Sequence, residues 1–174
     1  LNVTKFQGLQ TVFEGHFENL TPFIQRMRLI KSQDEIDKML IAGQYADKAV
    51  QIGIDNISLN RTETDILAKI EFGMKEQGIN KMSFETMVLT GDNAANPHGE
   101  PGVNRIENNA LLLFDLGVMY EGYASDMTRT VAVGQPDQFK QDIYNLCLEA
   151  QLTAQDFVKP GVTASEVDHA ARQV

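Results

Sequence analysis

The sequence predicts an α+β fold in which an antiparallel sheet carries helices on one face. Patterns typical of helices fill Ser32–Gly78 and the stretch from Pro136 onward, whereas strand-like patterns fill Phe84–Val133 between them. A tight turn at Glu121–Gly122 joins two of these strands. Helices and strands gathered in separate blocks favour an α+β protein over a fold that alternates the two.

The leader, residues 1–25, is expected to be the tail of an N-terminal domain or a linker. Val3–Phe13 suggests a strand and a turn, and Phe17–Ile24 suggests a short helix broken near Pro22. The stretch is too short to hold a hydrophobic core of its own. We therefore expect the main domain to occupy residues 26–174.

Three helices are predicted to begin with capping boxes, in which a hydroxyl and a carboxylate three residues later satisfy free N–H groups. The boxes are Ser32 with Glu35, Thr62 with Asp65 and Thr163 with Glu166. Apolar residues at helical spacing follow each box, and another such stripe follows Pro136.

These helices form two pairs, and only the first pair is followed by strands. Chance is one explanation, because helix pairs are common. The alternative is an incomplete duplication whose second sheet lies beyond Val174.

Composition and charge exclude several kinds of partner. Lys and Arg number 15 against 24 Asp and Glu, so the net charge of −9 would repel a nucleic acid backbone. The longest apolar run, Ala110–Phe114, is far short of the roughly 20 residues that span a membrane. A single cysteine, Cys147, cannot close an internal disulfide and favours a reducing, cytoplasmic location. Its helical surroundings predict a small core residue.

Asp115 is the most unusual residue, because it lies inside the apolar strand Leu111–Gly117. A buried carboxylate costs several kcal/mol unless something pairs with it. If Glu121–Gly122 forms a two-residue turn, Asp115 and Asp126 project from the same face as diagonal neighbours, roughly 7–8 Å apart.

Two carboxylates in this arrangement repel each other unless a cation lies between them, and oxygen ligands suit a divalent metal such as manganese or cobalt. The alternative is a salt bridge from Arg129 to Asp115, with Asp126 solvated. Thr128 either hydrogen-bonds one of the aspartates or reflects strand propensity alone. Turn formation explains Asn93 and Asn96.

Phe84–Gly134 resembles the pita-bread metallopeptidases, which include Xaa-Pro dipeptidase (prolidase), aminopeptidase P, methionine aminopeptidase and creatinase. The segments that carry the resemblance are Gly91–His98, Leu113–Gly117 and Gly122–Thr130. The lead-in Met27–Ile36 looks like that of the prolidase and aminopeptidase P branch. The resemblance implies a pita-bread (creatinase/aminopeptidase) fold of which residues 26–174 are the N-terminal half, with the C-terminal half absent.

The resemblance also implies two divalent metal ions, with Mn²⁺ foremost and Co²⁺ or Zn²⁺ as alternatives. Asp115 and Asp126 match the first two of five ligands in that family, and Asp126 would bridge the two ions. His98 matches a histidine near the substrate that assists proton movement and is not a ligand. The family's ligand histidine and two ligand glutamates have no match here. His169, without flanking glycines, is interpreted as a helix-surface residue.

The function implied by the resemblance is metal-dependent hydrolysis of Xaa-Pro dipeptides by a homodimer, this chain alone being inactive. An aminopeptidase P-type activity is the alternative within the same class. A non-catalytic domain that binds peptides or proteins, and creatinase-like hydrolysis, are alternatives from other classes. Retention of both Asp115 and Asp126 argues against the non-catalytic domain.

Overall fold

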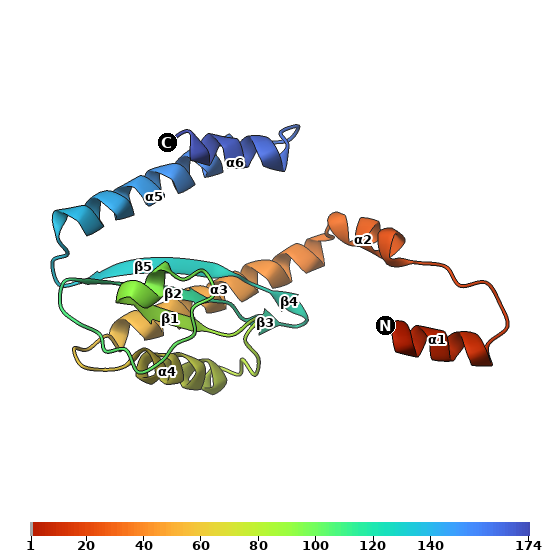
Figure 1. Cartoon of the computed structure of the whole chain (residues 1–174), viewed down its shortest axis with the longest axis horizontal. Helices are drawn as coiled ribbons and strands as arrows, with labels where there is room; N and C mark the ends of the chain where they lie inside the picture. Colours follow the sequence, from red (N-terminus) through yellow and green to blue (C-terminus); the bar gives the residue numbers. More distant parts are fainter. Residues whose placement is uncertain (1) are drawn as a thin grey trace. The chain divides into compact units, whose positions relative to one another are not determined.

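The computed structural model describes residues 2–174 (Figure 1) and separates at Ile36 into two compact units. The first unit contains the helices α1 (Val3–Val12) and α2 (Thr21–Leu29). Residue 1 of the expected leader lies outside the described part of the chain. The second unit, Asp37–Val174, contains the sheet.

Two expectations for the leader are wrong. Val3–Val12 is a helix and not a strand, in keeping with apolar residues that recur every three positions. The side chain of Asn2 caps this helix by accepting a hydrogen bond from the backbone N–H of Lys5 at 2.9 Å. Pro22 does not break a helix but stands in the first turn of α2. A proline is tolerated there because a first-turn N–H has no partner within the helix.

The remaining elements follow in the predicted order. They are α3 (Gln33–Asp55), α4 (Glu63–Glu76), β1 (Met87–Thr90), the short 3₁₀ helix η1 (Gly91–Ala95), β2 (Ala110–Leu116), β3 (Met119–Tyr120), β4 (Tyr123–Ala124), β5 (Met127–Val133), α5 (Gln138–Phe157) and α6 (Ala164–Arg172). The strands β1, β2 and β5 form an antiparallel sheet in the order β1-β2-β5, and β3 pairs with β4. This confirms the predicted α+β class.

All three predicted capping boxes are present. The carboxylates of Glu35, Asp65 and Glu166 accept hydrogen bonds from the backbone N–H groups of Ser32, Thr62 and Thr163 at 2.7, 2.9 and 2.8 Å. These local contacts fix where α3, α4 and α6 begin, independently of what the helices pack against.

The predicted hairpin register is confirmed. Glu121 and Gly122 both adopt positive φ angles, 46° and 88°, as a two-residue hairpin turn of type I′ requires. Tyr120 lies opposite Tyr123, and Asp115 lies opposite Thr128. The same register therefore runs through both strand pairs, and a one-residue slip would have moved Asp115 to the other face.

The two faces of the sheet have different surroundings. Leu112, Phe114 and Leu116 are buried against α3 and α4, and Gly53 of α3 lies so close to Phe114 that an added Cβ would be 2.6 Å from the ring. Asp115 alternates with these residues and therefore projects from the opposite face.

The helix α5 is packed less closely than the sequence suggests. It buries none of its residues, so Cys147 is exposed and the prediction of a core cysteine is wrong. Within residues 2–174, no helix has the length and apolar character needed to cross a membrane.

Candidate functional site

The three predicted site residues line the same cavity in the structure. Asp115 of β2, Asp126 just before β5 and His98 of the loop after η1 all line a cavity of about 540 Å³. Phe84 and Glu100 are also part of its wall. The predicted diagonal placement of the two aspartates on one face agrees with this common cavity.

Asp115 has an oxygen that no protein group satisfies. Its Oδ1 atom is buried and has no hydrogen-bond partner within the described residues. Burial raises the pKa of the Asp115 carboxyl, a hydrogen bond from Thr128 lowers it, and the charge of Asp126 raises it further. An unsatisfied carboxylate oxygen beside a second carboxylate is an arrangement that a bound cation would stabilise.

The alternative salt bridge from Arg129 is not formed. Arg129 pairs with Phe114 across the strands, and its guanidinium donates to the backbone carbonyl of Thr128 at 2.8 Å. Thr128 lies directly opposite Asp115 across the strands, and its hydroxyl lowers the pKa of the Asp115 carboxyl.

The backbone around Asp126 is fixed by a network that sequence reasoning missed. The hydroxyl of Ser83 donates to the carbonyl of Ser125 at 2.8 Å, and the N–H of Val118 donates to the hydroxyl of Ser125 at 3.0 Å. Gly117 leaves no room for a side chain, because an added Cβ would overlap the Ser125 carbonyl oxygen. The hairpin is thus held closed next to Asp126.

His98 is exposed at the rim of the cavity and is held by its backbone. Its N–H donates to the side-chain oxygen of Asn96 at 3.1 Å, which confirms the turn-forming role predicted for Asn96. The next residue, Gly99, is buried, and an added Cβ there would lie 2.8 Å from Leu89.

A second missed residue is Glu63, at the start of α4. Its side chain is fully buried and accepts hydrogen bonds from Asn93, so turn formation alone does not explain Asn93. The sequence carries a signal for it, because Glu63 lies on the same helical stripe as the buried Ile66 and Ile70. A charged residue on a core-facing stripe requires polar partners.

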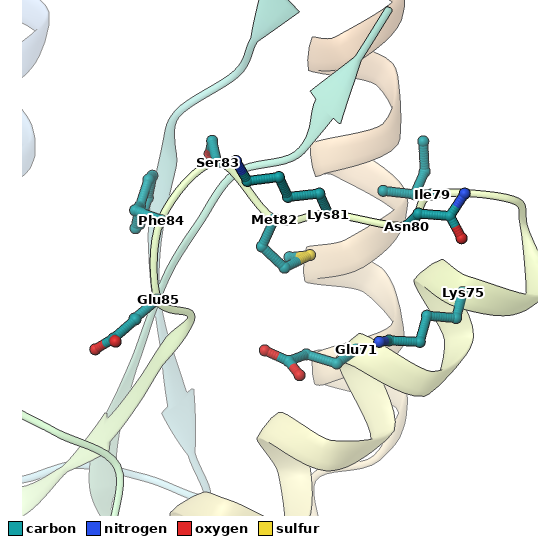
Figure 2. A pocket seen from close by; sticks show the side chains of 9 residues that line it. All are labelled: Glu71, Lys75, Ile79, Asn80, Lys81, Met82, Ser83, Phe84 and Glu85. Carbon is teal, nitrogen blue, oxygen red and sulfur yellow. The ribbon is translucent and has the colours of Figure 1, made fainter. Parts of the chain in front are cut away.

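Figure 2 shows a second pocket, which has a volume of about 400 Å³. Glu71 and Lys75 reach it from α4, and the segment 79–85 forms the rest of its lining. Phe84 and Glu85 line both pockets, so they form the wall between them.

The other two histidines, His16 and His169, are not among the residues that line the cavity. His169 is exposed on α6, as predicted, and His16 is exposed in the first unit. Within residues 2–174, no group of three or more His, Cys, Asp or Glu side chains is arranged to hold a metal ion. Asp115 and Asp126 thus offer carboxylate oxygens, which suit a hard divalent cation, but they are two ligands and not a complete set.

Comparison with known proteins places this geometry in a family. An uncharacterized peptidase of Staphylococcus aureus is 48% identical over 151 residues, which cover 87% of this chain and 43% of that protein. A prolidase from Pyrococcus furiosus matches with a TM-score of 0.95 and 37% identity over 99% of this chain and 51% of its own. An X-Pro aminopeptidase from Thermotoga maritima matches with a TM-score of 0.91 and 29% identity over 99% and 49%.

These matches confirm the predicted pita-bread fold. The chain spans about half the length of the relatives it matches. The sequence model of metallopeptidase family M24 matches residues 37–174, which is most of the chain and includes every residue of the cavity described above. The chain belongs to metallopeptidase family M24, a family of peptidases that use divalent metal ions.

Proposed function

We propose that this chain supplies part of the two-metal site of an Xaa-Pro dipeptidase, with Asp115 and Asp126 as metal ligands. The observation that carries the proposal is the buried, unsatisfied Oδ1 of Asp115 in a cavity shared with Asp126. Asp115 lies within β2 and Asp126 lies directly before the paired strand β5, so the sheet positions both carboxylates and a cation could bind without rearranging the backbone.

We infer the Xaa-Pro substrate from individual relatives, because membership of family M24 does not by itself specify a substrate. The P. furiosus relative is a prolidase, and its likeness extends over 99% of this chain. The T. maritima relative supports an aminopeptidase acting on longer Xaa-Pro peptides as the second candidate. This chain spans about half of either protein, so the Xaa-Pro substrate is proposed for the full-length protein and not for this chain alone.

The residues of the cavity have distinct roles in the proposed reaction. Bound divalent ions would activate a water molecule and polarise the scissile carbonyl. Asp126 would contact both ions and Asp115 one of them, while Thr128 orients the Asp115 carboxylate by hydrogen bonding. His98, at the rim of the cavity, would move a proton near the reacting carbonyl.

The proposal is tested with the full-length protein stripped of metal. Addition of Mn²⁺ is expected to restore hydrolysis of Xaa-Pro dipeptides, with Co²⁺ and Zn²⁺ compared alongside. A tripeptide with proline in the second position separates dipeptidase from aminopeptidase activity. Binding of metal without cleavage of any Xaa-Pro peptide would refute the enzymatic function.

Assembly and location complete the proposal. We expect a cytoplasmic homodimer. Light scattering after gel filtration of the full-length protein tests the dimer, and cell fractionation tests the location.

A further inference from the structure

Glu63 is a fully buried carboxylate that lies outside the cavity lining, at the first position of α4. Its oxygens accept hydrogen bonds from neutral amide groups of four residues. The donors are Thr90 N at 2.8 Å, Asn93 Nδ2 at 3.2 and 3.0 Å, Gly102 N at 2.9 Å and Asn104 Nδ2 at 3.2 Å. Glu63 therefore acts only as an acceptor in these contacts, as an ionised carboxylate does.

The four donors lie on both sides of His98 along the chain. Thr90 and Asn93 precede it, and Gly102 and Asn104 follow it. The backbone adds a second connection, since the N–H of Glu63 donates to the carbonyl of Asn104 at 3.0 Å. The segment Thr90–Asn104 is thus a loop whose two ends are joined at one carboxylate.

Asn93 transmits this constraint to His98. An added Cβ at Gly99, the residue after His98, would lie 3.0 Å from the Asn93 carbonyl oxygen and 3.1 Å from its side-chain oxygen. Gly99 is therefore packed directly against Asn93. We therefore expect a shift of Asn93 to displace Gly99, and with it the backbone of His98.

We propose that Glu63 is a positioning residue that holds the His98 loop against the cavity containing Asp115 and Asp126. This inference rests on the proposed function, in which His98 moves a proton near the substrate. Glu63 itself would touch neither metal nor substrate. It would act by fixing where the loop returns to the sheet.

A change of Glu63 to glutamine tests this sharply. The Oε1 atom accepts from the backbone N–H of Thr90, and Oε2 accepts from the backbone N–H of Gly102. In either orientation of the amide, its NH₂ group would face a backbone N–H that cannot rotate away. One backbone donor is then left unsatisfied, so an isosteric substitution should loosen the loop.

The first measurement is amide hydrogen exchange in the full-length, metal-free protein. Glu63→Gln should speed exchange within residues 90–104 by about tenfold or more, while β2 and β5 keep their protection. The control is Glu76→Gln, which neutralises an exposed carboxylate at the other end of the same helix. Equal loop exchange in the two variants would overturn the proposal. This result needs no substrate, so it stands even if the Xaa-Pro activity is wrong.

The second measurement is a double-mutant cycle with His98→Ala. Glu63→Gln should lower kcat for Xaa-Pro hydrolysis roughly 10- to 100-fold when His98 is present, but less than about threefold when it is absent. Equal losses on both backgrounds would show that Glu63 acts on the fold in general and not through His98. If Glu63→Gln does not fold, Asn93→Ala, which removes one side-chain donor, is judged by the same criteria.

Discussion

At the level of single residues, Asp115 combines features that a structural carboxylate lacks. Asp115 is held in a strand, has a buried oxygen without a hydrogen-bond partner among residues 2–174, and lies close to the charge of Asp126. A protein that gained only stability from this position would do better with an apolar residue or a paired charge. The arrangement makes physical sense when a cation completes it.

Asp126→Asn in the full-length protein is expected to abolish metal-dependent Xaa-Pro cleavage and to leave the fold intact. The amide keeps the shape of the side chain but removes the charge that two bound ions would share. Metal content by mass spectrometry and secondary structure by circular dichroism provide the measurements. Asp47→Asn, an exposed position on α3, is the matched control. Full activity with unchanged metal content would refute the bridging role.

His98→Ala is expected to lower kcat by roughly 10²–10⁴, the usual contribution of acid–base assistance, with unchanged metal occupancy. His169→Ala removes an exposed histidine on α6 and should have no effect. If His98→Ala instead released metal, His98 would be a ligand and its assigned role would be wrong.

At the level of elements, the start of α4 has two separate tasks. Thr62 and Asp65 cap the helix, whereas Glu63 between them holds the His98 loop. The cap acts locally, and the Glu63 contacts reach across 27 to 41 positions of the chain. Local and long-range requirements are therefore met by adjacent residues.

The cap gives the element a defined pH dependence. Hydrogen bonds from the backbone and the side chain of Thr62 lower the pKa of Asp65 below its usual 3.8. A lowered folded-state pKa stabilises the fold above the unfolded-state pKa, and this contribution is lost as the pH falls through the folded-state pKa. The difference in unfolding free energy between wild type and Asp65→Asn should therefore shrink below about pH 4.

Denaturant unfolding between pH 7 and pH 3 measures this difference. The control is Glu76→Gln, which removes a carboxylate of the same helix that takes no part in the N-terminal cap. Thr62→Ala should lower the unfolding free energy by about 1 kcal/mol, the usual value of an N-cap. A difference between wild type and Asp65→Asn that persists unchanged to pH 3 would contradict the assigned cause.

At the level of the whole molecule, apolar side chains remain exposed over α5. Phe139, Leu146 and Leu152 are 72%, 53% and 49% exposed. Exposed apolar side chains of this kind are typical of a surface that another segment or another chain covers, and the chain spans about half the length of the relatives it matches.

The 174-residue chain expressed alone is expected to be inactive and to bind metal weakly. Asp115 and Asp126 provide two carboxylates, so water would supply most of the coordination and the ions would exchange freely. Metal titration and Xaa-Pro hydrolysis, before and after addition of a separately expressed C-terminal half, provide the test. A chain that alone cleaves Xaa-Pro peptides, or holds two ions tightly as a monomer, would contradict the shared site.

The sequence by itself determined where helices begin and how the hairpin strands pair, because these features depend on residues close together in the chain. The capping boxes at Ser32, Thr62 and Thr163 require residues only three positions apart, and the turn at Glu121–Gly122 sets a register that places Asp115 and Asp126 on one face. The same local reasoning failed at Val3–Val12, which is a helix capped by Asn2, although its apolar residues recur every three positions, as in a helix.

Only the tertiary structure decided how distant segments meet. The carboxylate of Glu63 is 27 positions from Thr90 and 41 from Asn104, and no short-range pattern specifies those partners. Likewise, Cys147 lies on a helical stripe, but its exposure depends on what covers α5. Periodicity identifies which face of an element is apolar, whereas burial and hydrogen bonding are settled by the segments that the folded chain brings against that face.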